Sequence, residues 1–424
     1  MTERELEILG EQAYQEAIRC IRCGYCQPTC PTYVVTGIEH SVARGRNYLA
    51  RKIYEKEIPL TKDFKDPIFE CLLCGACNTN CAPVVKTQQI MAAARAMYIH
   101  TFGQPPLQRF VFNELLPNPR RMTRLMKLAS LGKRSGISGL AQALRVFKWI
   151  GKNIANAEGL LKTLPGKFLR ERLTEIQFPA RDSNLKIGYF VGCGINYAFP
   201  DVGLATLHYL TRNKYSVEVL ENLCCGLPAS GYGDVAAAKR MAQRNIEIVE
   251  KSGCDIVVSE CGSCSSFLSE YVHLLAGEPA WERRAQEFSR RVMDINVFLT
   301  QFPRARELKA TQAIVTYHDP CHLGHYMKIK EQPRQLLQQI EGIEFREMAE
   351  ADWCCGGAGT YNIAHYDLSM KILKRKIENV RRTEASVLTS SCPGCLIQLS
   401  YGIRKYNHNA QVKHIIQILN ESLE

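Results

Sequence analysis

Cysteines at the spacing of metal ligands are the residues of this chain best suited to chemistry. Nineteen cysteines occur in 424 residues, and eighteen of them fall into four patterned sets. Two runs read C-x2-C-x2-C-x3-C: Cys20, Cys23, Cys26, Cys30, and Cys71, Cys74, Cys77, Cys81. Two longer sets read C…CCG…C-x2-C: Cys193, Cys224, Cys225, Cys261, Cys264, and Cys321, Cys354, Cys355, Cys392, Cys395. Thiolates at such spacings hold iron–sulfur clusters, and several clusters in one chain would form a path for electrons.

The two four-cysteine runs predict a pair of cubane [4Fe-4S] clusters. Three cysteines two residues apart can bind one cluster from a single loop, and the fourth is expected to begin a helix that carries it to the other cluster. The expected ligand sets are therefore crossed: Cys20, Cys23, Cys26 and Cys81 for one cluster, and Cys71, Cys74, Cys77 and Cys30 for the other. Zinc competes for C-x2-C pairs, but eight cysteines in two such runs fit the ferredoxin pattern better. Cys30 is followed by Pro31, whereas Cys81 is followed by Ala82, so the turn after Cys81 is undecided.

The two longer sets belong to a duplicated half of the chain. Their corresponding cysteines are offset by 128, 130 and 131 residues. Strands are predicted at 186–192, 216–221, 255–260, 313–319 and 386–390, and helices at 234–251 and 365–382. This alternation predicts an α/β fold with parallel sheets. Cys193, Cys261, Cys321 and Cys392 each follow a predicted strand, so the sites are expected at the carboxyl edge of each sheet. Gly226, Gly356 and Gly357 are expected to let the backbone approach a cluster closely.

Four segments are expected from these patterns. Residues 1–105 would form a mainly α-helical, ferredoxin-like domain, with helices at 11–19 and 86–100. Residues 106–182 would be a basic helical connector, followed by a first CCG unit at 183–310 and a second at 311–424. The name CCG unit refers to the Cys-Cys-Gly triplet in each half.

The connector carries nearly all of the excess charge. Fourteen Lys and Arg against three Glu lie between Arg109 and Arg172, a net of +11 in a chain whose net charge is +12. One interpretation is a solvated helical linker, and the other is a docking surface for an acidic subunit or an anionic membrane face. No nucleic-acid-binding module is visible, so no nucleic-acid partner is expected.

The first residues and the cysteine usage indicate a cytoplasmic protein. The start MTERELEILG is polar and resembles no secretory signal, and no stretch of about 18 apolar residues predicts a membrane span. An odd number of cysteines without a signal argues against a disulfide scaffold. Membrane contact, if made, is expected to be peripheral, on the inner face.

The whole chain outside the connector resembles one family of oxidoreductase subunits. The matching segments are the eight N-terminal cysteines, YFVGC at 189–193, CCG at 224–226, HDPCH at 318–322, CCGGAGTY at 354–361 and CPGC at 392–395. They are similar to the glycolate/lactate dehydrogenase iron–sulfur subunit and to the D-type heterodisulfide reductase. In the reductases, a full five-cysteine motif implies a noncubane [4Fe-4S] cluster. The resemblance therefore implies two such clusters here, besides the two cubanes.

Two functions remain open at this level. In the first, an FAD-containing subunit oxidises a 2-hydroxy acid of the glycolate or lactate type, and this chain relays single electrons to a quinone or another carrier. In the second, the paired CCG clusters cleave a thiol disulfide. A third and weaker interpretation is a cluster-containing scaffold or redox sensor. No catalytic residue is assigned, and no flavin or nicotinamide motif is visible.

A few further residues have alternative roles. Cys254 is more simply explained as a small buried residue than as a ligand. His318 and His322 flank Cys321 and would either donate hydrogen bonds to cluster sulfurs or have surface and capping roles. Trp353 is expected to pack over a cluster.

Overall fold

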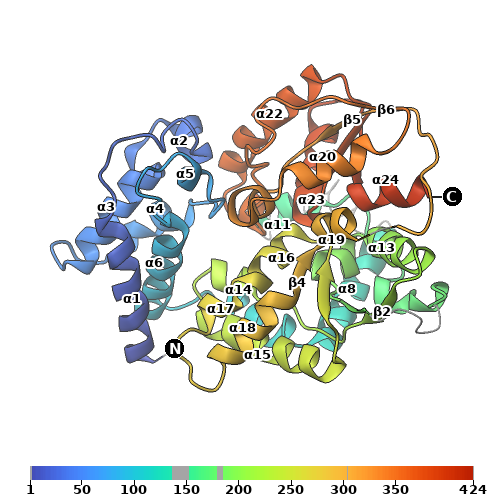
Figure 1. The fold of residues 1–424 in the computed structure, drawn as a ribbon. Helices are drawn as coiled ribbons and strands as arrows, with labels where there is room; N and C mark the ends of the chain where they lie inside the picture. Colours follow the sequence, from blue (N-terminus) through green and yellow to red (C-terminus); the bar gives the residue numbers. More distant parts are fainter. Residues whose placement is uncertain (1, 136–151, 179–184, 303, 424) are drawn as a thin grey trace.

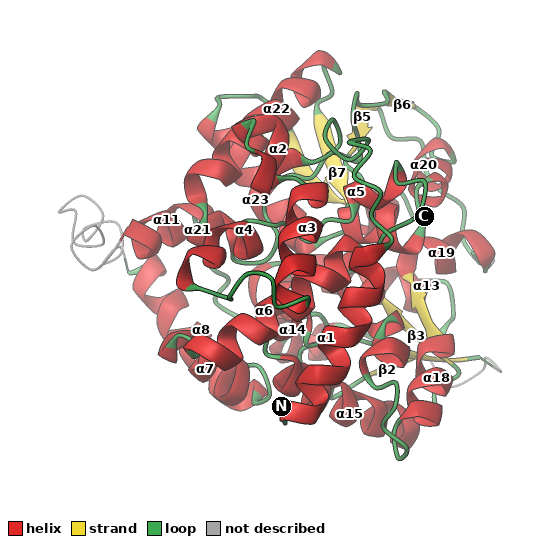
Figure 2. Cartoon of the chain, turned by 90° about the vertical axis from the view of Figure 1, so that its left-hand side faces the viewer, coloured by secondary structure: helices red, strands yellow, loops and turns green. Residues whose placement is uncertain are grey.

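The protein is described here by a computed structural model covering residues 2–135, 152–178, 185–302 and 304–423. The N-terminal domain lies beside both CCG units, with the first unit in green and yellow and the second in orange and red (Figure 1). Helices cover both small sheets (Figure 2). The mainly helical N-terminal domain and the α/β C-terminal half are thus as the sequence predicts.

Eight helical segments build the N-terminal domain. Thr2 and Glu5 form a capping box at the start of the first helix, which satisfies backbone N–H groups that a helix start leaves unpaired. Buried Ala13 and Ala17 then let this helix pack closely on its neighbours. The segments are α1 (Glu3–Ile18), α2 (Pro31–Thr36), η1 (Glu39–Ser41), α3 (Ala43–Tyr54), η2 (Lys62–Phe64), α4 (Lys65–Phe69), α5 (Ala76–Thr79) and α6 (Thr87–Phe102).

The described part of the connector is helical and lies against the C-terminal half. Its segments are α7 (Pro106–Phe110), η3 (Val111–Leu115), α8 (Pro119–Arg134), α11 (Lys152–Leu160), η4 (Leu169–Glu171) and η5 (Leu173–Glu175). Thr123 of α8 is hydrogen-bonded to Tyr197 of the first unit, and α11 packs on helices of the second unit. Residues 136–151 and 179–184 of the predicted connector lie outside the described residues.

Each CCG unit contains a four-stranded parallel sheet, in the orders β2-β1-β3-β4 and β6-β5-β7-β8. The strands are β1 (Lys186–Tyr189), β2 (Ser216–Val219), β3 (Ile256–Ser259), β4 (Val292–Asp294), β5 (Ala313–Tyr317), β6 (Ile343–Phe345), β7 (Val387–Ser390) and β8 (Gln411–His414). The two registers correspond, since Ile187 pairs with Val217 in the first sheet and Val315 with Phe345 in the second. The duplication seen in the sequence is therefore a duplication of structure. The strands β4, β6 and β8 were not predicted.

Helices surround the two sheets. The first unit contains α12 (Cys193–Ala198), α13 (Pro200–Arg212), α14 (Leu227–Gly231), α15 (Val235–Ser252), α16 (Gly262–Ser269), α17 (Tyr271–Leu274), α18 (Glu282–Arg291) and α19 (Ile295–Gln301). The second contains η6 (His322–Met327), α20 (Glu331–Gln338), α21 (Tyr361–Ala364), α22 (Tyr366–Arg382), α23 (Pro393–Lys405) and α24 (Ile415–Glu421). The helices predicted at 234–251 and 365–382 correspond to α15 and α22.

The two CCG units share one hydrophobic core. The helix α13 of the first unit packs on α24 of the second, and α20 of the second packs on α19 of the first. The resulting cluster joins Tyr189 and Ile195 to Tyr317 and Ile415. Because each unit covers apolar surface of the other, the two sheets are held in a fixed relative position.

Candidate metal centres

The first ferredoxin site is the name used here for Cys20, Cys23, Cys26 and Cys81. These four cysteines line one hollow of about 360 Å³, to which Cys77 also contributes. Cys23 is exposed and the other three are half-buried. The hollow therefore collects one of the two crossed sets expected from the spacing, at the surface of the protein.

The second ferredoxin site is the name used for Cys30, Cys71, Cys74 and Cys77, which line a neighbouring hollow of about 380 Å³. Cys77 lines both hollows, so the two sites are adjacent. Cys30 is the N-cap of α2, as expected for a fourth cysteine carried away by a helix. No helix begins at Cys81, where a turn precedes α6 and the N–H of Val85 donates to Cys81 Sγ at 3.4 Å. The expectation of a helix after each fourth cysteine is thus wrong for the second run.

The ten CCG cysteines form one continuous row of thiols. The first CCG site runs through Cys193, Cys224, Cys225, Cys264 and Cys261, each within hydrogen-bonding reach of the next. The second CCG site runs in the corresponding order through Cys321, Cys354, Cys355, Cys395 and Cys392. Cys261 and Cys392 are in contact with each other and join the two rows.

The second cysteine of each CCG triplet has a lowered pKa. Hydrogen bonds from Cys224 and Cys264 lower the pKa of the Cys225 thiol to about 5. Hydrogen bonds from Cys354 and Cys395 lower the pKa of the Cys355 thiol in the same way. The thiolate is the metal-ligating form of cysteine, so these central positions fit a metal site.

The strand ends and helix starts position these thiols as the sequence predicts. Cys261 and Cys392 follow β3 and β7 and are the N-caps of α16 and α23. Cys193 begins α12 after β1, and Cys321 precedes η6 after β5. Helix N-termini carry partial positive charge that favours anionic ligands. Both CCG sites therefore lie at the carboxyl edges of their parallel sheets.

The glycines of the two triplets serve the helices behind them. Gly226 and Gly356 have φ of +95° and +85°, a left-handed conformation that side chains disfavour. A Cβ on Gly356 would lie 2.9 Å from Ser369 O of α22, and one on Gly226 would lie 3.3 Å from Ala238 of α15. Gly357 does not share the positive φ, and its Cβ would lie 3.5 Å from Cys355 Sγ. The first two glycines thus permit close packing of helix and loop, and the N–H of Gly356 also donates to Cys354 Sγ at 3.4 Å.

The second CCG site abuts the second ferredoxin site. Leu72 and Cys74 share a hydrophobic cluster with Trp353 and Cys354. Burial raises the pKa of the Cys74 thiol, and the proximity of Cys354 raises it further. Trp353 is buried in this cluster, as its predicted packing role requires.

Residues of η6 hold the two sites together. His325 Nδ1 lies 2.8 Å from Cys74 O, and the hydroxyl of Tyr326 donates to Leu73 O at 2.5 Å. Gly75, with φ of +74°, is required there because a Cβ would lie 2.7 Å from the Tyr326 ring. Sequence reasoning did not identify these two residues, although both lie close to the HDPCH segment that it singled out.

The connector covers the first CCG site, at the end of the CCG row away from the ferredoxin sites. A hollow of about 360 Å³ beside Cys193 and Cys224 is lined by Pro119 and Met122 of α8 and by Arg170. The guanidinium of Arg170 donates to Leu220 O at 2.7 Å and to Asn222 Oδ1 at 3.2 Å. The first CCG site is therefore covered by the connector, while the second is covered by the ferredoxin domain.

Three other residues that the sequence singled out are buried or half-buried. Cys254 is buried in the first unit and packs in its core. His322 Nδ1 lies 3.7 Å from Cys321 Sγ and 3.4 Å from Ser263 Oγ of the other unit. His318 is fully buried, and an atom of its ring lies within 4.8 Å of the sulfurs of Cys355 and Cys395. A surface role for His318 is thereby excluded.

Models of three protein families match successive parts of the chain. A model of the 4Fe-4S dicluster domain matches residues 16–84, and one of the cysteine-rich domain matches 187–269 and 315–400. A model of the glycolate oxidase iron-sulfur subunit linker region matches 103–161. A probable glycolate oxidase iron-sulfur subunit of Bacillus subtilis is 31% identical, over 99% of this chain and 98% of that protein. The chain belongs to the glycolate oxidase iron–sulfur subunit family.

Shorter relatives match as well. Lactate utilization protein A of Oceanobacillus iheyensis is 33% identical over 57% of this chain and 98% of that protein. Among solved structures, a crystal structure of a hypothetical protein from Helicobacter pylori aligns over 90% of this chain and 76% of that chain, with a TM-score of 0.44 and 11% identity. The family membership and the dicluster and cysteine-rich domains make this chain an iron–sulfur protein.

Proposed function

We propose that the chain is the electron-transfer subunit of a 2-hydroxy acid dehydrogenase complex. It would relay single electrons from an FAD-containing subunit that oxidises a glycolate- or lactate-type acid to a quinone or another carrier. The observation that carries this proposal is the unbroken succession of four cysteine sites. The first ferredoxin site shares Cys77 with the lining of the second, Cys74 of the second adjoins Cys354, and Cys392 contacts Cys261.

The donor sets fit iron–sulfur clusters. Each ferredoxin hollow is lined by the four thiols of its own set, the number that a [4Fe-4S] cluster requires, and Cys77 of the second set also reaches the first hollow. Each CCG row offers five, in keeping with the noncubane type. When bound, such clusters supply one-electron donor and acceptor centres. The protein's own contribution is to bury the inner thiols and to bring successive sites into contact.

The two ends of this path differ in their surroundings. At the ferredoxin end Cys23 is exposed, and the side chains of Ile21 and Tyr25 beside it are exposed too. At the other end the first CCG site lies beneath α8, whose Arg120 and Arg124 are exposed. A partner at either end would reach a terminal site, and the relay has no need of a substrate pocket within the chain.

The partners are inferred from the relatives. A glycolate oxidase iron–sulfur subunit is named as one part of a larger enzyme, and an FAD-containing dehydrogenase subunit is the partner that the chemistry of a 2-hydroxy acid requires. No described helix is both long and apolar enough to cross a membrane. A cytoplasmic location, with any membrane contact peripheral, is part of this proposal and rests on the cysteine usage, which suits a reducing compartment.

Interrupting the row in its middle tests the relay. In the complex with its flavoprotein, Cys355→Ala removes a central ligand of the second CCG site. Reduction of a soluble quinone by the hydroxy acid should then fall at least tenfold, while reduction of a dye directly at the flavin is unchanged. Cys254→Ala, a buried cysteine outside the rows, is the matched control. Undiminished quinone reduction by Cys355→Ala would overturn the relay.

Iron analysis and EPR separate the remaining alternatives. Four [4Fe-4S] clusters correspond to about sixteen iron atoms per chain, and a value near eight would remove the CCG sites from the proposal. A new paramagnetic signal that requires a small thiol during oxidation would instead favour disulfide cleavage at the CCG sites.

A further inference from the structure

The two CCG sites have the same thiols but different buried neighbours. Sequence offsets of 128 and 131 residues, set by the cysteines themselves, align His318 with Phe190 and Lys376 with Asn245. All four residues are buried. The duplication thus provides an internal comparison. The second site has a histidine and a lysine where the first has a phenylalanine and an asparagine.

Lys376 is a fully buried cation behind the second CCG site. Its Nζ donates to the carbonyl of Ala351 at 3.1 Å, to that of Glu350 at 2.5 Å and to Met348 Sδ at 3.8 Å. These acceptors are neutral, and no ion pair of Lys376 is found among the described residues. The ammonium group therefore has no carboxylate within bonding distance. Burial lowers the pKa of Lys376 to about 8, while the nearby Cys355 and Cys354 favour its charged form.

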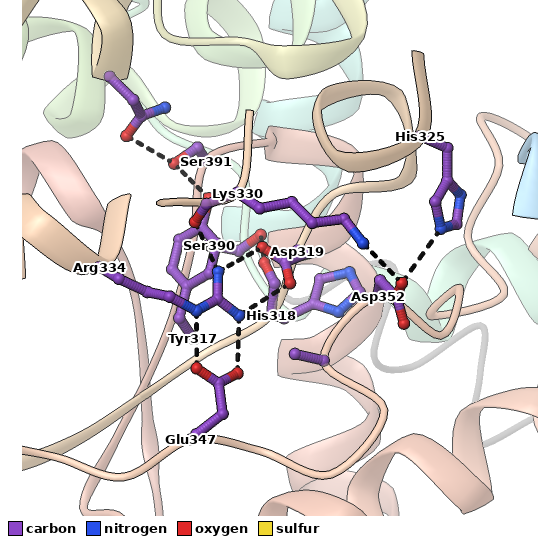
Figure 3. Close-up of polar contacts among 12 residues, drawn as sticks. Tyr317, His318, Asp319, His325, Lys330, Arg334, Glu347, Asp352, Ser390 and Ser391 are labelled. Atoms are coloured by element: carbon purple, nitrogen blue, oxygen red, sulfur yellow. Dashed lines mark hydrogen bonds and ion pairs between the residues drawn. The ribbon is translucent and has the colours of Figure 1, made fainter. Parts of the chain in front are cut away.

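The carboxylates that also act on Lys376 are paired with other cations. Asp319 accepts two hydrogen bonds from Arg334 at 2.9 Å each, and Asp352 accepts one from Lys330 at 2.9 Å (Figure 3). Neither carboxylate therefore neutralises Lys376, and its charge can act on the second CCG site.

Asn245 occupies the corresponding position at the first CCG site. Its Oδ1 accepts from Leu223 N at 2.9 Å, and its Nδ2 donates to Cys224 O at 3.0 Å and to the Tyr271 hydroxyl at 3.1 Å. Every polar atom of this neutral side chain has a partner. At this position the first site therefore has a neutral side chain, bonded to residues 223 and 224 of its loop, where the second site has a lysine.

His318 is the second difference. Neither of its ring nitrogens has a hydrogen-bond partner in the described protein, and no dashed line reaches the ring in Figure 3. Its backbone is fixed by a hydrogen bond from His318 N to Thr389 O at 2.9 Å. A buried polar group without a partner costs free energy unless something satisfies it. The ring lies beside the sulfurs of Cys355 and Cys395 and also near the carbonyl of Ala351, so the sulfurs of this site are among its available acceptors.

We propose that His318 donates a hydrogen bond to sulfur at the second CCG site and that, together with Lys376, it gives this site a higher reduction potential than the first. A nearby positive charge and hydrogen bonds to sulfur both stabilise the reduced, more negative state of a cluster. The second site would then hold the electron longer than its neighbour. This inference rests on the proposal that both CCG sites hold iron–sulfur clusters, and it does not depend on which partners the chain serves.

Potentiometric EPR titration of the anaerobic full-length protein tests it. Signals are first assigned by Cys224→Ala and Cys355→Ala, which remove the first and the second CCG cluster. The wild-type second site should be reduced at the higher potential. Lys376→Met and His318→Phe, the residue of the first unit, should each shift its reduction equilibrium at least tenfold toward the oxidised form, about 59 mV for one electron. The ferredoxin signals should not move.

Conservative variants show whether charge and hydrogen bonding are responsible for the higher reduction potential of the second CCG site. Lys376→Arg and His318→Asn should stay close to the wild-type potential, as should Lys374→Met on the exposed face of α22. Labelling histidine with nitrogen-15 should give a hyperfine coupling at the second CCG cluster that His318→Phe abolishes.

Two results would overturn the inference. One is a wild-type first site that is reduced at the higher potential. The other is an unshifted second site in Lys376→Met and His318→Phe with full iron content. If these variants lose iron, the order of the two wild-type potentials decides the question alone. Iron near eight atoms per chain would instead refute the clusters on which the inference rests.

Discussion

A buried ion pair lies directly before the first cysteine of the second CCG motif. Asp319 is 2% exposed, and the planar guanidinium of Arg334 binds both of its oxygens and also Glu347. Arg334 also lies over the ring of Tyr317 (Figure 3). The residue aligned with Asp319 in the first unit is Val191, so this pair is a feature of the second unit alone.

Removing the cation should damage the second CCG site selectively. In Arg334→Met the carboxylate of Asp319 stays buried without its partner, which costs about 3–5 kcal/mol. We expect a lower unfolding midpoint in denaturant and loss of the second CCG signal before the others. Adding Asp319→Val, the residue of the first unit, should restore most of the stability. Equal destabilisation of the single and the double variant would contradict this explanation.

The sequence identifies the eighteen patterned cysteines as candidate ligands, because residue type and spacing are local properties of the chain. Neither Arg334 nor Lys376 has such a signal. Each lies within an ordinary amphipathic helix, and only the folded structure places it behind a cysteine loop. The burial of His318 likewise depends on Thr389 and Ser390 of the neighbouring strand.

At the scale of elements, the strands that were missed share a position. The strands β4, β6 and β8 are sheet edges and have three or four residues each. Short edge strands pair on one side only and need little apolar alternation, so their sequences VMD, IEF and QVKH give no signal. The central strands β1, β3, β5 and β7 are mostly buried and were predicted. The edge strand β2 was predicted too, because its sequence SVEV alternates valine with polar residues.

The helix α8 carries exposed leucines beside its basic residues. Leu125, Leu128 and Leu131 are 45%, 68% and 66% exposed. Arg121 and Lys127 pair with Glu114 and Glu171, whereas Arg120 and Arg124 have no ion pair among the described residues. A face that is both basic and apolar suits docking to an acidic partner surface.

Neutralising the two arginines tests this docking surface. Arg120→Gln with Arg124→Gln should weaken binding of the flavoprotein subunit several-fold at low salt. The effect should be small at about 0.5 M salt, where exposed charges are screened. Lys371→Gln with Lys374→Gln, two exposed positions on α22, is the matched control. Binding that is equally weakened in both pairs would show a net-charge effect, and unchanged binding would favour a solvated linker.

At the scale of the whole molecule, the two CCG units are joined by a core and by a buried histidine. His414 is the N-cap of α24, and its Nδ1 accepts from Ile416 N at 3.2 Å. Its Nε2 donates to Glu260 O of the first unit at 2.9 Å. These two contacts require the neutral ring, and burial lowers the pKa of His414 to about 4. The sequence shows the duplication, but not which faces of the units meet, because that depends on helices such as α13 and α24 that are far apart in the chain.

The depressed pKa makes this junction sensitive to acid. As the pH falls, His414 is protonated first in the unfolded chain, where a histidine has a pKa near 6.5. The contribution of neutral His414 to the free energy of unfolding is therefore complete above pH 6.5 and is lost as the pH falls toward 4. The change amounts to about 3 kcal/mol at 1.36 kcal/mol per unit of pKa. The difference in free energy of unfolding between wild type and His414→Asn, measured by thermal unfolding, should therefore decrease by up to that amount between pH 7 and pH 4. A constant difference across this range would contradict the assignment.

The gradient of cysteine burial along the proposed relay path should also set the resistance of its sites to air. Cys23 is exposed, whereas eight of the ten CCG cysteines are buried and the other two are half-buried. Dioxygen would meet the first ferredoxin site before any other, because oxidation follows exposure. A preparation handled briefly in air would thus keep most of its iron and its fold yet lack the outermost centre. Such a protein would have nearly the colour of the intact one, but it would not exchange electrons at that end.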